Sequence, residues 1–319
     1  MDYRDIVRVN KNVKEKLITK KNDLLVCARN GSARLIGKNA ILHEADANQT
    51  FGAFMMVFRS DKNHFVHQLL NTRRYSSQVS ENLGARINQI TSSDLSSFEF
   101  FFPTENSEMN KIAALLDLLD ERIATQNKII DKLQSLIKGI SSRIFASIQG
   151  IEYRMGDIVT ITNGNSNVQD AVTQSKDGLY PFFDRSEDIK YLPTFLFDKE
   201  AIIYPGEGTE FMPRYFKGKF ALHQRCYAIF DFNEIINARF LYFYLKTRNS
   251  YFVKNAVGST VPSLRLDTFQ KLKVIIPPKK IQHSVSLCLS SMEQKCNVEE
   301  KILHKLLKQK QYLLRQMFI

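Results

Sequence analysis

The sequence contains no apolar run long enough to cross a membrane. Its longest, the eight residues from Phe51 to Phe58, falls far short of the roughly 20 that a transmembrane helix needs. Asp2, Arg4 and Asp5 stand where a signal peptide would need an apolar stretch. With only 13 glycines and 8 prolines in 319 residues, the chain is neither fibrous nor disordered.

Cysteines and catalytic motifs are equally sparse. The four cysteines have neither paired nor metal-ligand spacing, which favours a reducing, cytoplasmic location: Cys27, Cys226, Cys288 and Cys296. The segment 31–39 resembles a phosphate loop, but five residues separate its glycines and it ends in Asn. A Gly-rich dinucleotide loop and an Asn-Pro-Pro-aromatic string are both absent from the sequence. The six histidines form no metal-spaced group, and we interpret His64 and His67 as surface residues of a helix. We therefore expect no catalysis, cofactor or metal in this chain.

What the chain does have is an uneven distribution of charge. Its net charge is +12, yet residues 151–213 carry 5 bases and 11 acids, whereas residues 214–280 carry 13 bases and 3 acids. We expect a basic face built from the later stretch. A polyanion, nucleic acid above all, is the favoured partner.

The chain also repeats itself at an offset near 174 residues. Residues 84–103 lie over residues 258–277, with the glycine and the apolar triplet before proline in common. The closing segments Phe98–Phe102 and Leu272–Ile276 are mainly apolar runs that end at proline. We expect each to be a largely buried strand that leads into a long helix.

The two helices carry the strongest pattern in the sequence. Apolar residues recur at alternating steps of four and three, as in a heptad seam, and the one polar break of the first copy, Gln126, matches Glu299 in the second. The seam of the first helix is Ile112, Leu116, Leu119, Ile123, Gln126, Ile130, Leu133, Ile137, Ile140 and Ile144. That of the second is Val285, Leu289, Met292, Cys296, Glu299, Leu303, Leu306, Lys310, Leu313 and Met317.

The order domain, helix, domain, helix predicts a closed layout. The first helix, about 38 residues long, spans about 57 Å at 1.5 Å per residue. If it crosses to the second domain and the second helix returns, the helices pair antiparallel and the C-terminus lies near the first domain. Gly150 is expected to be a left-handed cap or hinge at the boundary.

The fold class we predict is therefore α+β: a tandem repeat of a mixed α/β domain followed by a long helix, the two helices pairing as an antiparallel coiled coil. The predicted domains are residues 1–108, with helix 109–150, and residues 151–280, with helix 281–319. Because 23–31 aligns with 200–208, the first domain has no counterpart of roughly 151–180. We expect its front part to be missing, and self-association or completion by another chain to be possible.

These features together resemble the specificity subunit of type I DNA restriction-modification systems. The strings that carry the resemblance are Leu179-Tyr-Pro-Phe-Phe-Asp184, Ala201-Ile-Ile-Tyr-Pro-Gly-Glu-Gly208, Val257-Gly-Ser-Thr-Val-Pro-Ser-Leu264, Val274-Ile-Ile-Pro-Pro278 and Lys111-Ile-Ala-Ala-Leu-Leu-Asp-Leu-Leu-Asp-Glu-Arg-Ile123. With their repeats they span nearly the whole chain. The departure is the shortened first target recognition domain.

The resemblance implies a non-catalytic DNA-recognition component of a restriction endonuclease and adenine methyltransferase complex, located in the cytoplasm of a bacterium or archaeon. Each domain would read one half of a bipartite target in double-stranded DNA, and the coiled coil would set their separation. The implied partners are two modification (methyltransferase) subunits and restriction subunits. S-adenosylmethionine, ATP and Mg²⁺ would be bound by those partners and not by this chain.

Basic residues in the late stretch of each domain are the candidates for DNA contact. Lysines would contact phosphates, whereas an arginine can read guanine through paired hydrogen bonds, which favours Arg214, Arg225 and Arg265 for specificity. The second-domain set is Arg214, Lys217, Lys219, Arg225, Lys246, Arg248, Lys254 and Arg265; the first-domain set is Arg29, Arg34, Lys38, Arg73, Arg74 and Arg86. We interpret 240–245 as core and not as a base-stacking platform, because the run lacks interleaved basic residues.

Two other classes of function stay open at this point. A stand-alone metal-dependent nuclease could use Asp188 and Lys190 with Asp170 or Asp177, and would cleave DNA in magnesium. A coiled-coil adaptor without sequence preference would bind DNA with little dependence on salt.

Overall fold

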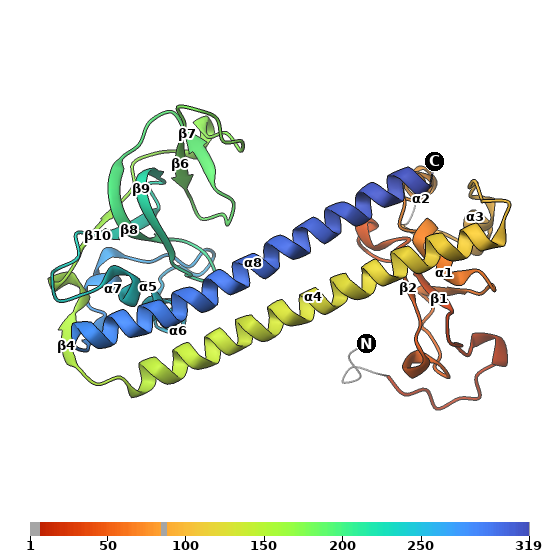
Figure 1. The fold of residues 1–319 in the computed structure, drawn as a ribbon, viewed down its shortest axis with the longest axis horizontal. Coiled ribbons are helices and arrows are strands. Elements are labelled where there is room, and N and C mark those ends of the chain that lie inside the picture. Colours follow the sequence, from red (N-terminus) through yellow and green to blue (C-terminus); the bar gives the residue numbers. More distant parts are fainter. Residues whose placement is uncertain (1–6, 84–87, 319) are drawn as a thin grey trace. The chain divides into compact units, whose positions relative to one another are not determined.

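The computed structural model describes residues 7–83 and 88–318, and it divides into two compact units. Unit 1 comprises residues up to 129 together with residues from 299 onward, and unit 2 comprises residues 130–298. Both long helices contribute to both units (Figure 1). Within the described residues, no helix is long and apolar enough to cross a membrane.

Unit 1 contains a small antiparallel sheet covered by short helices. The strands are β1 (Leu24–Cys27), β2 (Asn39–Ile41) and β3 (Met55–Phe58), in the order β2-β1-β3. Around them lie η2 (Glu15–Leu17), η3 (Ala33–Leu35), η4 (Glu44–Asp46), α1 (Asn63–Leu69), α2 (Arg73–Leu83) and α3 (Ser92–Ser97). Leu24 and Val26 of β1 are fully buried against Val66, Tyr75 and Val79 of the helices, which form the core.

Unit 2 contains a six-stranded sheet in the order β5-β10-β8-β9-β6-β7. Its strands are β5 (Thr160–Asn163), β6 (Tyr180–Phe183), β7 (Lys190–Leu192), β8 (Phe197–Pro205), β9 (Arg214–Leu222) and β10 (Cys226–Phe230). A separate pair joins β4 (Ile151–Arg154) to β11 (Lys273–Ile276). The short helices are η5 (Met155–Asp157), η6 (Val168–Asp170), α5 (Ala238–Lys246), α6 (Asn249–Asn255) and α7 (Leu266–Gln270).

The main core of unit 2 forms where α5 packs between the sheet and the long helices. All residues of α5 from Ala238 to Leu245 except Arg239 are buried. The ring of Phe145, near the end of the first long helix, packs edge-on against Phe240 and Tyr244 at 5.5 Å. The interpretation of 240–245 as core is therefore confirmed.

The two sheets share a common three-strand centre, as the repeat predicts. In unit 1, β1 pairs antiparallel with β2 and β3; in unit 2, β8 pairs antiparallel with β9 and β10. The repeat aligns residues 23–27 with residues 200–204, so β1 corresponds to the central residues of β8. The strands β5, β6 and β7 flank this centre in unit 2, and no described segment of unit 1 takes their places. The α+β tandem repeat is confirmed.

One of the two expected closing strands is absent. In unit 2, β11 forms as predicted, because all four of its residues pair antiparallel with β4. In unit 1, residues Phe98–Phe102 form no strand, and Phe101 and Phe102 are exposed. The prediction of a largely buried strand there was wrong: an extended segment needs a partner for its backbone groups, and no described segment of unit 1 supplies the equivalent of β4.

The long helices are α4 (Asn106–Ser147) and α8 (Lys279–Met317). All seventeen apolar seam residues singled out from the sequence are buried or half-buried: Ile112, Leu116, Leu119, Ile123, Ile130, Leu133, Ile137, Ile140, Ile144, Val285, Leu289, Met292, Cys296, Leu303, Leu306, Leu313 and Met317. Within unit 1, Gln126 contacts Glu299 while Asp120 contacts Lys310, so the helices run antiparallel there (Figure 1). Within unit 2, Ile140 and Ile144 share a core cluster with Val285, Leu289 and Met292.

The polar break of both seams forms one buried contact. The Gln126 side-chain amide donates to the Glu299 carboxylate at 2.6 Å and to the Glu299 carbonyl at 3.1 Å, and both side chains are buried. If one helix shifted along the other, the two buried polar side chains would be separated, and each would stay desolvated without its partner. The pair therefore selects the register in which they meet.

The small domain of unit 1 is fixed to the helices by polar and aromatic contacts. The Gln68 amide donates to Asp117 at 2.8 Å and to Asp120 at 2.9 Å, and His64 contacts Asp117. The ring of Phe318 lies 5.2 Å from that of Phe65, so the C-terminal end of α8 lies on the first domain, as the closed layout predicted.

Gly150 is required for a reason other than the one expected. It does not adopt the left-handed conformation, so the predicted cap was wrong. A Cβ at this position would instead lie 2.3 Å from the Ile276 carbonyl oxygen, the last residue of β11. The glycine is needed because the backbones entering β4 and leaving β11 approach so closely.

Candidate nucleic-acid interface

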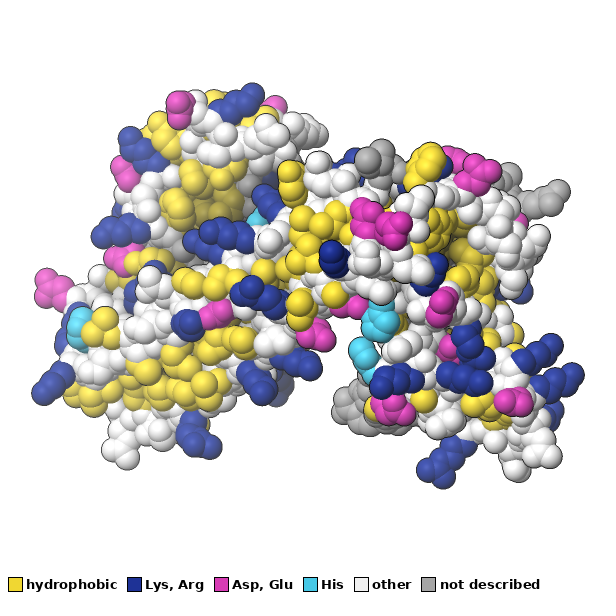
Figure 2. Space-filling model, turned by 45° about the vertical axis from the view of Figure 1, so that its right-hand side comes forward, with side chains coloured by type: hydrophobic (Ala, Val, Ile, Leu, Met, Phe, Trp, Pro, Cys, Tyr) yellow, Lys and Arg dark blue, Asp and Glu magenta, His cyan; other side chains and the backbone are white. Residues whose placement is uncertain are grey.

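The acidic and basic stretches of the second domain meet each other in the folded structure. Glu207 of the acidic stretch pairs with Arg225 of the basic stretch, and Glu152 pairs with Lys273. In a third pair the charges are exchanged, since Lys199 belongs to the acidic stretch and its partner Asp231 to the basic one. The charge reversal seen along the sequence is thus partly neutralised by pairing across strands. Figure 2 shows lysines and arginines interspersed with hydrophobic and acidic side chains on the face it presents.

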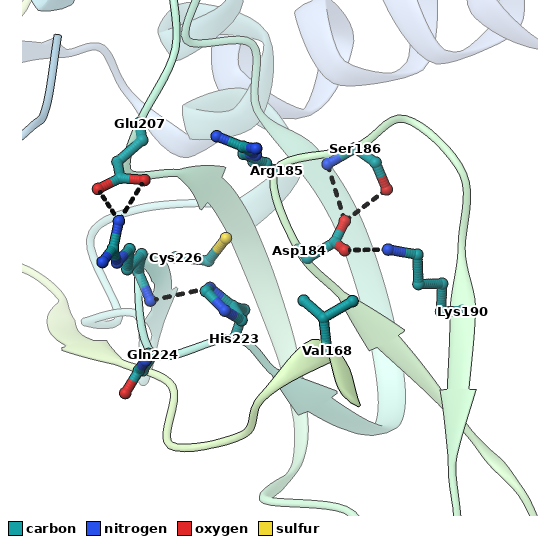
Figure 3. A pocket seen from close by; sticks show the side chains of 10 residues that line it. Val168, Asp184, Arg185, Ser186, Lys190, Glu207, His223, Gln224 and Cys226 are labelled. Atoms are coloured by element: carbon teal, nitrogen blue, oxygen red, sulfur yellow. Dashed lines mark hydrogen bonds and ion pairs between the residues drawn. The ribbon is translucent and has the colours of Figure 1, made fainter. Parts of the chain in front are cut away.

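Unit 2 contains a pocket of about 500 Å³ lined by charged and polar residues, which we call the β9–β10 pocket (Figure 3). It lies where the ends of β6 and β8 meet the turn that joins β9 to β10. Its lining residues are Val168, Asp184, Arg185, Ser186, Lys190, Glu207, His223, Gln224, Arg225 and Cys226. Three cations and two carboxylates therefore surround one cavity.

Asp184 anchors one wall of this pocket. Its buried carboxylate accepts hydrogen bonds from the Ser186 backbone N–H at 2.7 Å and from Lys190 Nζ at 2.6 Å. Burial opposes ionisation, but the bonds from Lys190 and Ser186 outweigh it and lower the pKa of Asp184. Arg214 donates to the Ser186 carbonyl from behind, so the loop after β6 is fixed on both sides.

The residues of the nuclease alternative are arranged differently from what it requires. Lys190 is engaged with Asp184 and not with Asp188, which is exposed. Among the described residues, no three His, Cys, Asp or Glu side chains lie together in a way that could hold a metal ion. The segment resembling a phosphate loop contains only the three-residue η3, so it does not lead into the helix that such a loop requires.

His223 and Cys226 also line the pocket, and both side chains are neutral near pH 7. Burial lowers the pKa of His223, and its Nδ1 accepts the Arg225 backbone N–H at 3.2 Å. Burial raises the pKa of the Cys226 thiol to about 11, so the thiolate needed for nucleophilic chemistry does not form near neutral pH.

Arg225 and Glu207 form the opposite wall. Arg225 Nη1 lies 2.8 and 3.1 Å from the two Glu207 oxygens. The arginine side chain is 63% exposed, whereas the glutamate is only 17% exposed. The carboxylate thus holds an arginine whose side chain is largely exposed to solvent.

The structure separates the second-domain candidates into two groups. Lys217, Lys219, Arg225, Lys254 and Arg265 are exposed. The other three are half-buried: Arg214 contacts Ser186, Lys246 pairs with Glu293 of α8 at 2.8 Å, and Arg248 lies over the Tyr244 ring at 4.3 Å. A cation engaged in this way has fewer donors left for DNA.

In the first domain, five candidates are exposed: Arg29, Arg34, Lys38, Arg73 and Arg74. Arg73 and Arg74 line a second cavity, of about 360 Å³, together with Arg315 near the end of α8. Arg74 also donates to the Glu99 carbonyl and lies over the Phe101 ring. Arg86 lies outside the described residues.

Sequence reasoning missed Arg185, Glu207 and Gln224 as pocket residues. The available signal was the glycine at 206, between β8 and Glu207: a Cβ there would lie 2.1 Å from the Arg225 carbonyl oxygen. A glycine that follows a buried strand in this way indicates a close approach of another backbone. It does not reveal which backbone, because residues 206 and 225 are brought together only by the pairing of β8 with β10.

Comparisons with known proteins agree with this architecture. The family model described as "Type I restriction modification DNA specificity domain" matches residues 2–135 and 151–308. The type I restriction enzyme EcoDI specificity subunit of Escherichia coli is 28% identical over 138 residues, which cover 43% of this chain and only 30% of that subunit's length.

Two solved structures share the fold. The S subunit of a type I restriction-modification system from M. genitalium superposes with a TM-score of 0.68 at 19% identity, covering 94% of this chain and 84% of that one. A chain from a structure of type I R-M complex assembly and conformational transition gives a TM-score of 0.54 at 13% identity, covering 94% and 82%. Since the family model matches both copies of the repeat, and most of the chain, this protein belongs to the type I restriction-modification DNA specificity family.

Proposed function

We propose that this chain is the DNA-specificity subunit of a type I restriction-modification complex and has no catalytic activity of its own. Each recognition domain would read one half of a bipartite, asymmetric target in double-stranded DNA. The observation that carries the proposal is the repeat: the family model matches two separate stretches, and each contains a three-strand centre of the same pairing followed by a long helix.

The exposed cations supply the affinity in this proposal. Lys217, Lys219, Lys254 and Arg265 in the second domain, and Arg29, Arg34 and Lys38 in the first, would contact phosphates or base edges. Binding should then weaken steeply as salt increases, because each neutralised phosphate releases counterions. An adaptor without a DNA-reading role predicts little such dependence.

We further propose that α4 and α8 set the distance between the half-sites. A continuous helix of 42 residues, the length of α4, spans about 63 Å, or about 18 base pairs. The buried Gln126–Glu299 contact supports this role, because a spacer is useful only if its register is fixed.

The partners we propose are two modification (methyltransferase) subunits, which the restriction subunits would join. An apolar groove of about 660 Å³ on the paired helices of unit 1 supports a docking role. Leu115 and Leu118 of α4 and Ile302 of α8 line it and are exposed. Exposed apolar side chains gathered in one groove favour burial by another protein. S-adenosylmethionine, ATP and Mg²⁺ would be bound by these partners.

Co-purification with a cognate methyltransferase subunit tests the proposal. Leu118→Lys should reduce complex formation about tenfold or more, because it places a charge in a groove that the partner would bury. Tyr312→Lys is the matched control: Tyr312 is 61% exposed and Leu118 60%, but Tyr312 lies on α8 outside the groove. Equal recovery of both variants would contradict the docking role. No complex with the unaltered chain would contradict the proposed function.

A further inference from the structure

We propose that Arg225 reads a guanine in the half-site bound by the second domain, and that Glu207 is the positioning residue that orients its guanidinium. The proposal rests on the proposed function and assigns a chemical role within it. Three observations at the β9–β10 pocket support it. The backbone of the turn that carries Arg225 is fixed, and the Arg225 guanidinium has one edge bound to Glu207 and one edge open. The Arg225–Glu207 pair has no net charge, which is unsuited to phosphate binding.

The turn that carries Arg225 is held on every side by backbone contacts. The His223 N–H donates to the Phe183 carbonyl at 2.9 Å, the Gln224 N–H to the Ser166 carbonyl at 3.1 Å, and the Gly206 N–H to the Arg225 carbonyl at 2.9 Å. These contacts come from three different parts of the domain. A turn fixed in this way holds the Cα of Arg225 in one place. A side chain that must match the edge of a nucleobase requires such a fixed starting point.

The guanidinium is oriented by one of its edges and open at the other. Both contacts with Glu207 run through Nη1, and Nε and Nη2 make no hydrogen bond with the described residues. Guanine presents two adjacent acceptors, O6 and N7, in the major groove, and arginine matches them with two parallel N–H donors. The open Nε–Nη2 edge has this geometry.

The charge balance distinguishes base reading from phosphate binding. The Arg225–Glu207 pair has no net charge, so it would release few counterions, and a carboxylate close to the DNA backbone would be repelled by phosphates. Glu207 therefore makes Arg225 a poor source of affinity. What the carboxylate does provide is direction, since it holds one end of a long, flexible side chain and removes much of its rotamer freedom.

Sequencing of methylated sites tests the assignment, with the full chain in complex with its methyltransferase subunits. Arg225→Lys keeps the charge but loses the paired donors. We expect one guanine position of the second half-site to become degenerate, with discrimination reduced about 10- to 100-fold. The first half-site and the gap between the half-sites should stay unchanged.

Glu207→Gln tests the positioning role. It keeps the volume and one acceptor of the side chain, and should relax the same guanine position several-fold while the melting temperature of the complex stays the same. Lys271→Gln is the control, because Lys271 is exposed, pairs with Asp267 on α7 and lies outside the pocket. It should leave the motif unaltered.

The outcomes separate the assignment from the proposed function. A bipartite motif for the unaltered chain that persists in Arg225→Lys and Glu207→Gln would overturn the assignment and leave the function standing; it would mean that Arg225 contacts only phosphate or solvent. No bipartite motif for the unaltered chain would overturn the function. If Arg225→Lys fails to fold, Glu207→Gln decides the assignment.

Discussion

At the scale of single residues, the carboxylate of Asp23 is a buried charge that the first domain must compensate. It lies at the start of β1 and is 1% exposed. Arg59 donates to both of its oxygens, Nε at 2.7 Å and Nη2 at 2.6 Å, and the Lys20 N–H donates at 2.7 Å. Removal of one member of such a pair leaves the other charge buried without compensation.

We predict that Arg59→Ala destabilises the chain by about 3 kcal/mol, because the Asp23 carboxylate is then left buried without its cation. Urea unfolding followed by the fluorescence of tyrosine or by circular dichroism measures the change. Lys21→Ala is the matched control: its pair with Glu44 is exposed on both sides and should contribute less than about 1 kcal/mol. Equal effects of the two substitutions would show that the Asp23 pair has no special role.

The same carboxylate predicts how stability depends on pH. Burial raises the pKa of Asp23, but the bonds from Arg59 and Lys20 outweigh it, so the net pKa lies below the ordinary value of 3.8. A carboxyl whose pKa is lower in the folded chain stabilises it above the unfolded pKa, and this contribution is lost as pH falls through the folded value. Unfolding free energies measured from pH 6 to pH 2 should therefore fall less steeply below pH 4 in Asp23→Asn. Identical slopes would contradict the lowered pKa.

At the scale of elements, two glycines of similar sequence context have opposite roles. Gly139 lies inside α4, and a Cβ there would meet nothing within 4 Å. Gly150 lies where the chain enters β4, and a Cβ there would meet the Ile276 carbonyl oxygen at 2.3 Å. The first glycine weakens its helix, whereas the second permits the pairing of β4 with β11.

We therefore predict opposite signs for the same substitution. Gly139→Ala should stabilise the chain by about 0.5–1 kcal/mol, because alanine is the better helix former. Gly150→Ala should destabilise it by about 1–3 kcal/mol, because the backbone must move to admit the methyl group. Thermal unfolding of the two variants side by side measures both. A stabilising Gly150→Ala would show that the close approach to Ile276 is absent.

The buried contact between the two long helices allows a further prediction. Replacement of Glu299 alone by Leu should cost about 1–3 kcal/mol, because the Gln126 amide loses its carboxylate partner. The double replacement by Leu should recover that loss, since an apolar pair suits the seam, but it should also permit other registers and association states. Denaturation and light scattering measure the two effects. A double variant as unstable as the single one would contradict this account.

These elements also show which parts of the fold can be predicted from the sequence alone. The heptads predicted both long helices to within three residues at their N-terminal ends, because 3.5-residue periodicity is a local property. The apolar run 272–276 was correctly read as a strand, whereas 98–102 was not a strand, although the two runs are similar. The difference is a pairing partner distant in the chain, and local patterns carry no information about it. The pocket escaped notice for the same reason, since Asp184, Glu207 and Arg225 meet only through the pairing of β6, β8, β9 and β10.

At the scale of the whole molecule, the two copies of the repeat are unequal. The second domain has strands on both sides of its three-strand centre and carries the β9–β10 pocket. The first has the three-strand centre, and no described segment pairs with the outer edges of β2 and β3. Both nevertheless carry exposed cations, and the family model matches both. We therefore expect both domains to read DNA, the second at more base positions than the first.

Sequencing of the sites methylated by the chain in complex with its methyltransferase subunits tests directly whether both domains read DNA at a fixed separation. We predict a bipartite, asymmetric motif whose two parts are separated by a gap of fixed length, because two domains would read DNA while paired helices of fixed register would set their separation. Methylation at scattered sites without a common motif, or a motif whose gap varies in length, would contradict it.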